Sequence, residues 1–112
     1  MFAEPTYELK GYTFLRAFAL SVDPASGKYE LTLTLSNDDA AGADVRTARF
    51  ADVAQLRLKE VGGGWTQFLY LAVEDRRADQ HDRAAYEVRD VENDLIAFVC
   101  SEVHVSIGAP AD

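Results

Sequence analysis

The sequence has few of the residues that form cross-links, bind metals or act as nucleophiles. Its 112 residues include one cysteine, Cys100, and two histidines. A single cysteine excludes an intrachain disulfide, which fits a reducing compartment. Cys100 ends an apolar run, and His104, four residues further along the same predicted strand, would lie about 13 Å away. We therefore interpret Cys100 as a buried, unreactive thiol and predict no catalytic residue.

Long apolar runs and an excess of basic residues are also missing. No run approaches the about 20 apolar residues that a membrane helix needs, and residues 1–5 do not begin a signal peptide. Nineteen acidic against eleven basic residues give a net charge of −8. An acidic surface repels nucleic acids and anionic membranes and favours a basic protein partner, although solubility alone also explains it. The sequence thus predicts a cytoplasmic protein that binds neither nucleic acid nor membrane.

The acidic residues match no metal motif. Asp90, Glu92 and Asp94 have the spacing that opens a calcium loop. Leu95 then stands where that loop needs glycine, and Ser101 stands where it needs a bidentate glutamate. We therefore predict no metal and no cofactor. One alternative stays open, a composite calcium site built by Asp38, Asp39, Asp90 and Asp94.

What the sequence does contain is a series of β-strand patterns. Residues 28–36 alternate between polar and apolar side chains, which is typical of a strand with one buried face. Residues 84–107 predict a hairpin whose second arm begins with the apolar run 95–100, which indicates a central strand. Residues 6–22 predict one long strand, and residues 44–49 predict a short edge strand.

Turn residues divide the rest of the chain into further short strands. Residues 50–53 break the alternation and predict a corner or a single helical turn. Residues 62–64, all glycine, predict a hairpin turn, because no Lys-Ser/Thr pair follows to make a phosphate loop. A strand should then run from Trp65 to Glu74. Together the patterns predict a single all-β domain over residues 1–112. It should be an antiparallel sandwich or strongly curled sheet of six or seven strands, with at most one short helix.

The residues best suited to bind a partner lie in predicted loops and at strand ends. Trp65 follows the three glycines, and an exposed tryptophan there is a natural interface anchor, with core packing as the alternative. Acidic residues in the other loops and strand ends are the remaining candidates. The full set of candidate protein-binding residues is Trp65, Asp38, Asp39, Asp75, Asp90, Glu92 and Asp94.

A set of turn and core residues between positions 50 and 101 carries a resemblance to a known family. The set comprises Phe50, Asp52, Val53, Leu56, Leu58, Gly62, Gly63, Gly64, Tyr86, Val88, Asp90, Glu92, Asn93, Asp94, Ile96, Phe98 and Cys100. In these residues the chain resembles small bacterial all-β proteins grouped with the immunity proteins of polymorphic toxin systems. The resemblance implies a fold family, and it carries over no catalytic residue.

These observations favour a non-enzymatic, acidic binding protein, an immunity-type inhibitor of a cationic toxin or of another basic protein. In this mechanism the acidic loops steer the partner, and an aromatic anchor such as Trp65 then docks. Two alternatives belong to other classes. One is a β-module that binds a small ligand or calcium. The other is a self-assembling scaffold domain in which an exposed strand pairs with its copy, as in a homodimer.

Overall fold

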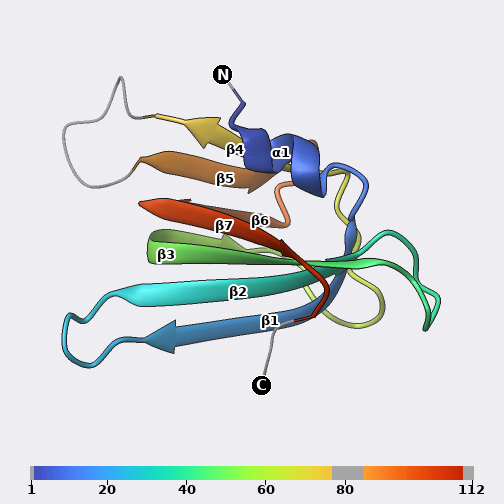
Figure 1. Cartoon of the computed structure of the whole chain (residues 1–112), viewed down its shortest axis with the longest axis horizontal. Coiled ribbons are helices and arrows are strands. Elements are labelled where there is room, and N and C mark those ends of the chain that lie inside the picture. Colours follow the sequence, from blue (N-terminus) through green and yellow to red (C-terminus); the bar gives the residue numbers. More distant parts are fainter. Residues whose placement is uncertain (1, 77–84, 110–112) are drawn as a thin grey trace.

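The computed structural model describes residues 2–76 and 85–109, which form one short helix and an antiparallel sheet of seven strands (Figure 1). The elements are α1 (Glu4–Leu9), β1 (Phe14–Val22), β2 (Tyr29–Ser36), β3 (Val45–Leu58), β4 (Leu71–Asp75), β5 (Tyr86–Asp90), β6 (Ile96–Cys100) and β7 (Glu102–Ile107). The strand order is β1-β2-β3-β6-β5-β4, and β7 pairs with β3. The predicted all-β fold of six or seven strands with at most one short helix is confirmed.

The sheet curls because the long strand β3 bends, and its neighbours β6 and β7 follow the same bend. The first half of β3 pairs with β2 and β7, and its second half pairs with β6. Because only Ser101 separates β6 from β7, these two strands act as one bent partner of β3. Figure 1 shows β7 in front of β6, and the first half of β3 in front of its second half. The sheet therefore folds back over itself.

The backbone conformation explains where β3 bends. Asp52 and Gln55 have φ angles of 56° and 57°, in the left-handed region that side chains other than glycine rarely adopt. The register against β2 shifts beside Asp52, and the register against β6 shifts across Gln55, so both residues lie at β-bulges. Ser101 fastens the partner strand at the same place, since its N–H donates to the Ala51 carbonyl over 2.9 Å. A corner does lie at residues 50–53, but it lies inside one continuous strand.

The core lies between the two parts of the folded sheet. Phe50 of β3 packs edge-on against Phe98 of β6, with ring centroids 4.8 Å apart. The predicted buried face of β2 is confirmed at Leu31, Leu33 and Leu35, which are completely buried. The opposite face is not wet along its whole length, because Thr34 and Ser36 are buried as well. The fully buried side chains of the sheet include Leu31, Leu33, Leu35, Phe50, Leu71, Val73, Val88 and Ile96. Burying each large apolar side chain stabilises the fold by about 1.5–3 kcal/mol.

The helix α1 covers the outer edge of β4. The Thr6 hydroxyl donates to the Val73 carbonyl over 3.0 Å and accepts the Val73 N–H over 2.8 Å. The Ala3 N–H also donates to the Val73 carbonyl, over 2.6 Å. Leu9, at the end of the helix, is completely buried in the core. The edge of β4 is therefore closed to other strands.

Two strand predictions are wrong because tertiary contacts override the local pattern. The predicted strand over residues 6–22 is helical at its start, where Pro5 occupies the first turn of α1 and fixes a helical φ. The predicted edge strand over residues 44–49 is instead part of β3 and lies between β2 and β7. Its alternation is compatible with either position, since side-chain burial there depends on strands far away in the sequence.

The predicted hairpin at residues 62–64 is also wrong. These glycines have φ angles of 103°, 78° and 142°, but they lie in a long connection, residues 59–70, between strands that do not pair. The strand predicted from Trp65 to Glu74 begins only at Leu71. Before it, Gln67 forms a single isolated bridge with Phe14. The hairpin of β5 and β6, in contrast, is confirmed by their pairing.

Candidate functional site

Three connections gather at one end of the sheet, which we call the loop end. They are residues 37–44 between β2 and β3, residues 59–70 between β3 and β4, and residues 91–95 between β5 and β6. The first two project from the right side of the molecule in Figure 1. A backbone hydrogen bond of 2.9 Å from Lys59 to Leu95 ties the second connection to the third.

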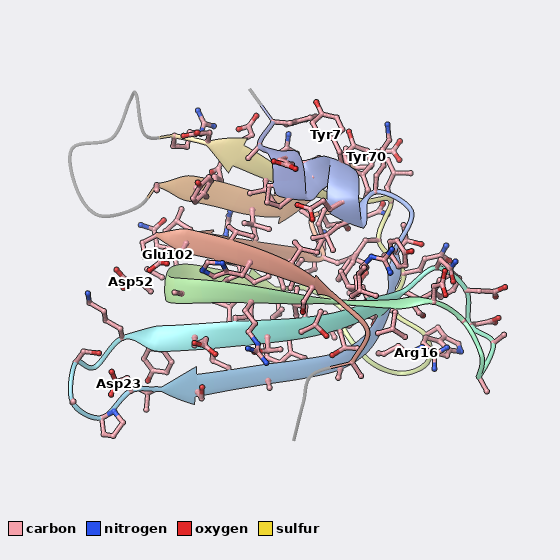
Figure 2. All side chains as sticks on the ribbon, viewed as in Figure 1. Tyr7, Arg16, Asp23, Asp52, Tyr70 and Glu102 are labelled. Carbon is pink, nitrogen blue, oxygen red and sulfur yellow. The ribbon has the colours of Figure 1, made fainter. Side chains whose placement is uncertain are left out.

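Arg16 of β1 holds the first of these connections in shape. It occupies a β-bulge, so its side chain departs from the regular alternation of the strand. Its Nε donates to the Ser36 hydroxyl over 2.9 Å, and its Nη2 donates to the carbonyls of Asp38 and Ala40 over 3.3 and 2.5 Å. Figure 2 shows the Arg16 side chain at the loop end. The planar guanidinium thus holds two carbonyls of this loop and the Ser36 hydroxyl at the end of β2.

Trp65 is held from two sides and still exposed. Its ring meets the Phe14 ring edge-on, with centroids 5.7 Å apart, and the Arg16 guanidinium lies 5.2 Å from the centre of the Trp65 ring. The backbone beside it is fixed as well, since the Leu15 N–H donates to the Thr66 carbonyl over 2.9 Å. Trp65 nevertheless keeps 51% of its surface exposed. It packs against Phe14 and Arg16 and presents an immobilised aromatic face to solvent.

Arg16 links this tryptophan to the loop that holds Asp38 and Asp39, because it contacts both the Trp65 ring and the Asp38 carbonyl. The Asp39 N–H donates to Asp38 Oδ1 over 2.6 Å. Hydrogen bonding from Asp39, first through its side chain and then through its backbone, lowers the pKa of Asp38 below its ordinary value, and the Arg16 charge adds to the effect. Asp38 therefore stays ionised. The structure brings together three of the sequence-predicted candidates: Trp65, Asp38 and Asp39.

Asp90 has a different role, because its side chain is completely buried. Its Oδ1 accepts the Leu69 N–H over 3.1 Å, and its Oδ2 accepts the Leu95 N–H over 3.2 Å. Burial raises the pKa of Asp90, against the opposing effect of these two N–H donors. The carboxylate joins the connections 59–70 and 91–95 by accepting one backbone hydrogen bond from each. Asp90 positions the loop end and is not itself available to a partner.

The remaining acidic candidates fall at two places. Glu92 and Asp94 are exposed in the turn 91–95 and belong to the loop end. Asp75 lies opposite Tyr86 at the start of β5, whereas Asp90 ends that strand. Four residues of a strand span about 13 Å, so Asp75 is at the other end of the sheet.

A second acidic surface, which the sequence did not predict, lies at that other end. A cleft of about 330 Å³ there is lined by carboxylates from four separate parts of the chain, together with Lys28. Those carboxylates are Asp23, Glu30, Asp52 and Glu102. Figure 2 shows Asp23, Asp52 and Glu102 near the tip of the β1–β2 hairpin. No local spacing could reveal this cleft, because only the bend of β3 and β7 brings its residues together.

Cys100 is completely buried and stands apart from His104, as the sequence predicted for an unreactive thiol. Burial, followed by the negative charge of Asp52, raises the pKa of Cys100 to about 12. His104 points away on β7, where its Nε2 lies 3.4 Å from Glu102 Oε1 at an exposed position.

We expect native Cys100 to resist alkylation by iodoacetamide at pH 8, because almost no thiolate is present and the sulfur is covered. The same reagent should modify the thiol completely in denaturant. Mass spectrometry of the intact protein measures both states. Rapid labelling of the folded protein would contradict the buried position of Cys100.

Metal binding finds no support among the residues that the structure describes. Within them, no group of three or more His, Cys, Asp or Glu side chains could hold a metal ion. The composite calcium alternative also fails at Asp90, because both of its carboxylate oxygens accept backbone N–H groups. Over residues 2–76 and 85–109, no helix has the length and hydropathy needed to cross a bilayer.

Sequence reasoning missed the residues that organise the loop end. Arg16 carried a signal, since it is the one charged residue within the apolar stretch from residue 11 to 22. No sequence pattern pairs Arg16 with a loop more than 20 positions away. The contact between Phe14 and Trp65 joins residues even further apart, and only the fold reveals it.

The curled sheet and the loop end define a class of protein: a small β-protein that exposes an immobilised aromatic ring and carboxylates at one end of its sheet. Residues 4–106 match the model of the family described as Immunity protein PIM8, and the chain belongs to this family. The match confirms the resemblance over residues 50–101 and extends it through the first half of the chain. No curated protein and no solved structure matches the chain. Membership suggests an inhibitor-type function against a toxin, with that toxin as the binding partner.

Proposed function

We propose that the protein is a non-enzymatic inhibitor that acts in the cytoplasm and covers a basic surface of a toxin with its loop end. The observation that carries this proposal is the position of Trp65, which is half exposed yet fixed by Phe14 and Arg16 beside Asp38 and Asp39. Family membership supplies the class of partner. The contacts at the loop end support the choice of surface.

An aromatic ring that is already immobilised is well suited to bind tightly. Ordering a flexible side chain at an interface costs about 0.5–1.5 kcal/mol, and a ring held before binding avoids most of that cost. Tryptophan is also among the residues that most often dominate interface energies. Trp65 meets both conditions, since its two ring contacts and the neighbouring bond from Leu15 to Thr66 exist without a partner.

Charge supports a basic partner. The net charge is −8, and Asp38, Asp39, Glu92 and Asp94 are exposed in the connections of the loop end. The lowered pKa of Asp38 keeps its carboxylate charged at every pH near neutrality. Such a surface accelerates the approach of a cationic protein and orients it before contact.

The test is the kinetics of binding to the toxin that the protein inhibits. We expect the association rate to fall by about tenfold or more as ionic strength rises from about 0.01 to 1 M, because salt shortens the reach of the charges. The dissociation rate should change much less. Stopped-flow fluorescence can follow both, with Trp65, the single tryptophan of the inhibitor, as a probe.

Two matched double variants separate electrostatic steering by the loop end from the effect of the overall negative charge. Asp38→Asn with Asp39→Asn removes two charges at the loop end, whereas Asp23→Asn with Glu30→Gln removes two charges at the opposite end. The first pair should slow association more than the second. Equal effects would contradict the choice of surface, and a salt-independent association rate would contradict the basic partner.

A further inference from the structure

One edge of β1 is open along most of its length. The strand pairs with β2 on one side throughout. On the other side it is engaged only at its start, where Leu15 bonds to Thr66 and Phe14 bridges to Gln67. Over residues 17–22, no backbone hydrogen bond within the described chain reaches this side.

This edge lacks the features that usually prevent strands from pairing. Residues 17–22 contain no charged residue and no proline, whereas exposed edges are commonly protected by lysine, proline, a bulge or a covering helix. The bulge at Arg16 lies before the open part. The terminal strand at the other side of the sheet, β4, is covered by α1 and by the Ala3 backbone.

The side chains of this edge form a half-covered apolar stripe. Phe18 lies opposite Leu33 and Leu20 lies opposite Leu31, so both point to the core side of the sheet. Leu20 is nevertheless 42% exposed, and Val22, two residues further on, is 46% exposed. Beside them runs an open groove of about 410 Å³, lined by Leu20, Tyr29, Val53, Ala54, Gln55 and Leu56. The core is therefore incomplete along β1.

We propose that β1 pairs antiparallel with β1 of a second copy of this chain, about a twofold axis at Leu20. In this register Leu20 lies opposite Leu20 of the second copy, and Phe18 lies opposite Val22. Both pairs fall on the core side of the sheet, so the two half-covered stripes become one. On the outer side Ala19 lies opposite Ser21, and both side chains are small enough to pack.

Charge at the two ends of the strand favours this orientation. The uncharged residues 17–22 are bounded by Arg16 at one end and by Asp23 at the other. Antiparallel pairing about Leu20 places Asp23 of each copy opposite Ala17 of the other, so the two Asp23 carboxylates lie at opposite ends of the paired strands. Parallel pairing would instead place like charges together. The strand is thus complementary to itself in one direction only.

A single pair of short strands makes a small interface, so the dimer should form at high protein concentration and dissociate on dilution. Sedimentation velocity and light scattering over a wide concentration range measure this equilibrium. The wild-type protein should approach twice the monomer mass at the highest concentrations.

Charge reversal at the axis provides the sharp test. Leu20→Lys and Leu20→Glu should each weaken self-association by at least about tenfold, because like charges would face each other across the axis. An equimolar mixture of the two variants should associate again, since lysine then faces glutamate. Ile107→Lys is the matched control: it adds the same charge at an apolar residue that is 83% exposed on β7, and it should leave the dimer intact.

Circular dichroism verifies that each variant folds. A wild-type protein that stays monomeric at every concentration would overturn the proposal. Failure of the lysine and glutamate variants to associate when mixed would overturn it as well. If the Leu20 variants lose binding to the toxin while the wild type is monomeric, this edge belongs to the toxin and the second copy is excluded. The proposal does not depend on the loop end, so each can fail without the other.

Discussion

Replacing Asp90 with alanine should lower the free energy of unfolding by about 2–5 kcal/mol, because the N–H groups of Leu69 and Leu95 would each lose a buried acceptor worth about 1–3 kcal/mol. The Asp90 carboxylate therefore joins these two connections through its two oxygens. Urea unfolding, followed by circular dichroism, measures the change. For a domain of this size, the melting temperature should fall by roughly 10 °C or more.

Two variants serve as controls for this prediction. Asp90→Asn keeps one oxygen to accept the Leu69 or the Leu95 N–H, so it should lose less stability than Asp90→Ala. Asp94→Ala removes an exposed carboxylate from the same turn, and its effect should stay within about 0.5 kcal/mol. If the midpoint of urea unfolding is the same for Asp90→Ala and the wild type, Asp90 does not hold the two connections together.

The pH dependence of the same site has a defined sign. Burial raises the folded-state pKa of Asp90 above the ordinary 3.8, so the folded protein keeps a proton that the unfolded chain has already released. The contribution of this group to stability is complete below pH 3.8 and is lost as the pH rises through the folded-state pKa. Asp90→Asn has no carboxyl group at this position, so its stability lacks this pH dependence. The stability difference between the wild type and Asp90→Asn should therefore shrink as the pH rises through that window.

The parts of the fold that the sequence predicted are those with local signals. The alternation of residues 28–36 indicates a strand with a buried face, and the apolar run at residues 95–100 indicates a buried strand. Both patterns can be interpreted without knowing which strands pair. The helix α1 had no such signal, since its stability depends on Thr6 meeting Val73, 67 positions away. The predicted strand at residues 44–49 stopped before the bend of β3 for a similar reason. That bend rests on left-handed φ angles at Asp52 and Gln55, which residue type does not reveal.

The candidate site, like the fold, could be predicted only where the sequence signal is local. Turn composition identified the loops that hold Trp65, Asp38 and Asp39, and these residues do lie together. Residue type could not separate an exposed carboxylate from a buried one, so Asp90 was grouped with its neighbours although it anchors the backbone. Loop length and polarity say where the chain leaves the sheet. They do not say which loops meet at the same end.

Trp65 is the anchor of the proposed interface. Trp65→Ala should weaken binding to the toxin that the protein inhibits by about 30-fold or more, which corresponds to the 2 kcal/mol that defines a dominant interface residue. The loss should appear mainly in the dissociation rate, since mutations within an interface change that rate more than association. Surface plasmon resonance or stopped-flow kinetics can resolve the two rates. Neutralisation of the toxin in cells should decline in parallel.

Tyr7→Ala is the matched control, because Tyr7 is an aromatic residue that is 63% exposed on α1 and lies away from Arg16 (Figure 2). It should leave both rates close to wild type. Arg16→Lys tests the immobilisation of the ring: lysine keeps the charge but loses the planar contact with Trp65 and the bonds to the carbonyls of Asp38 and Ala40. If the fixed ring is what binds, Arg16→Lys should raise the dissociation rate as Trp65→Ala does, to a smaller extent. A loss confined to the association rate would show instead that the loop end acts through charge alone.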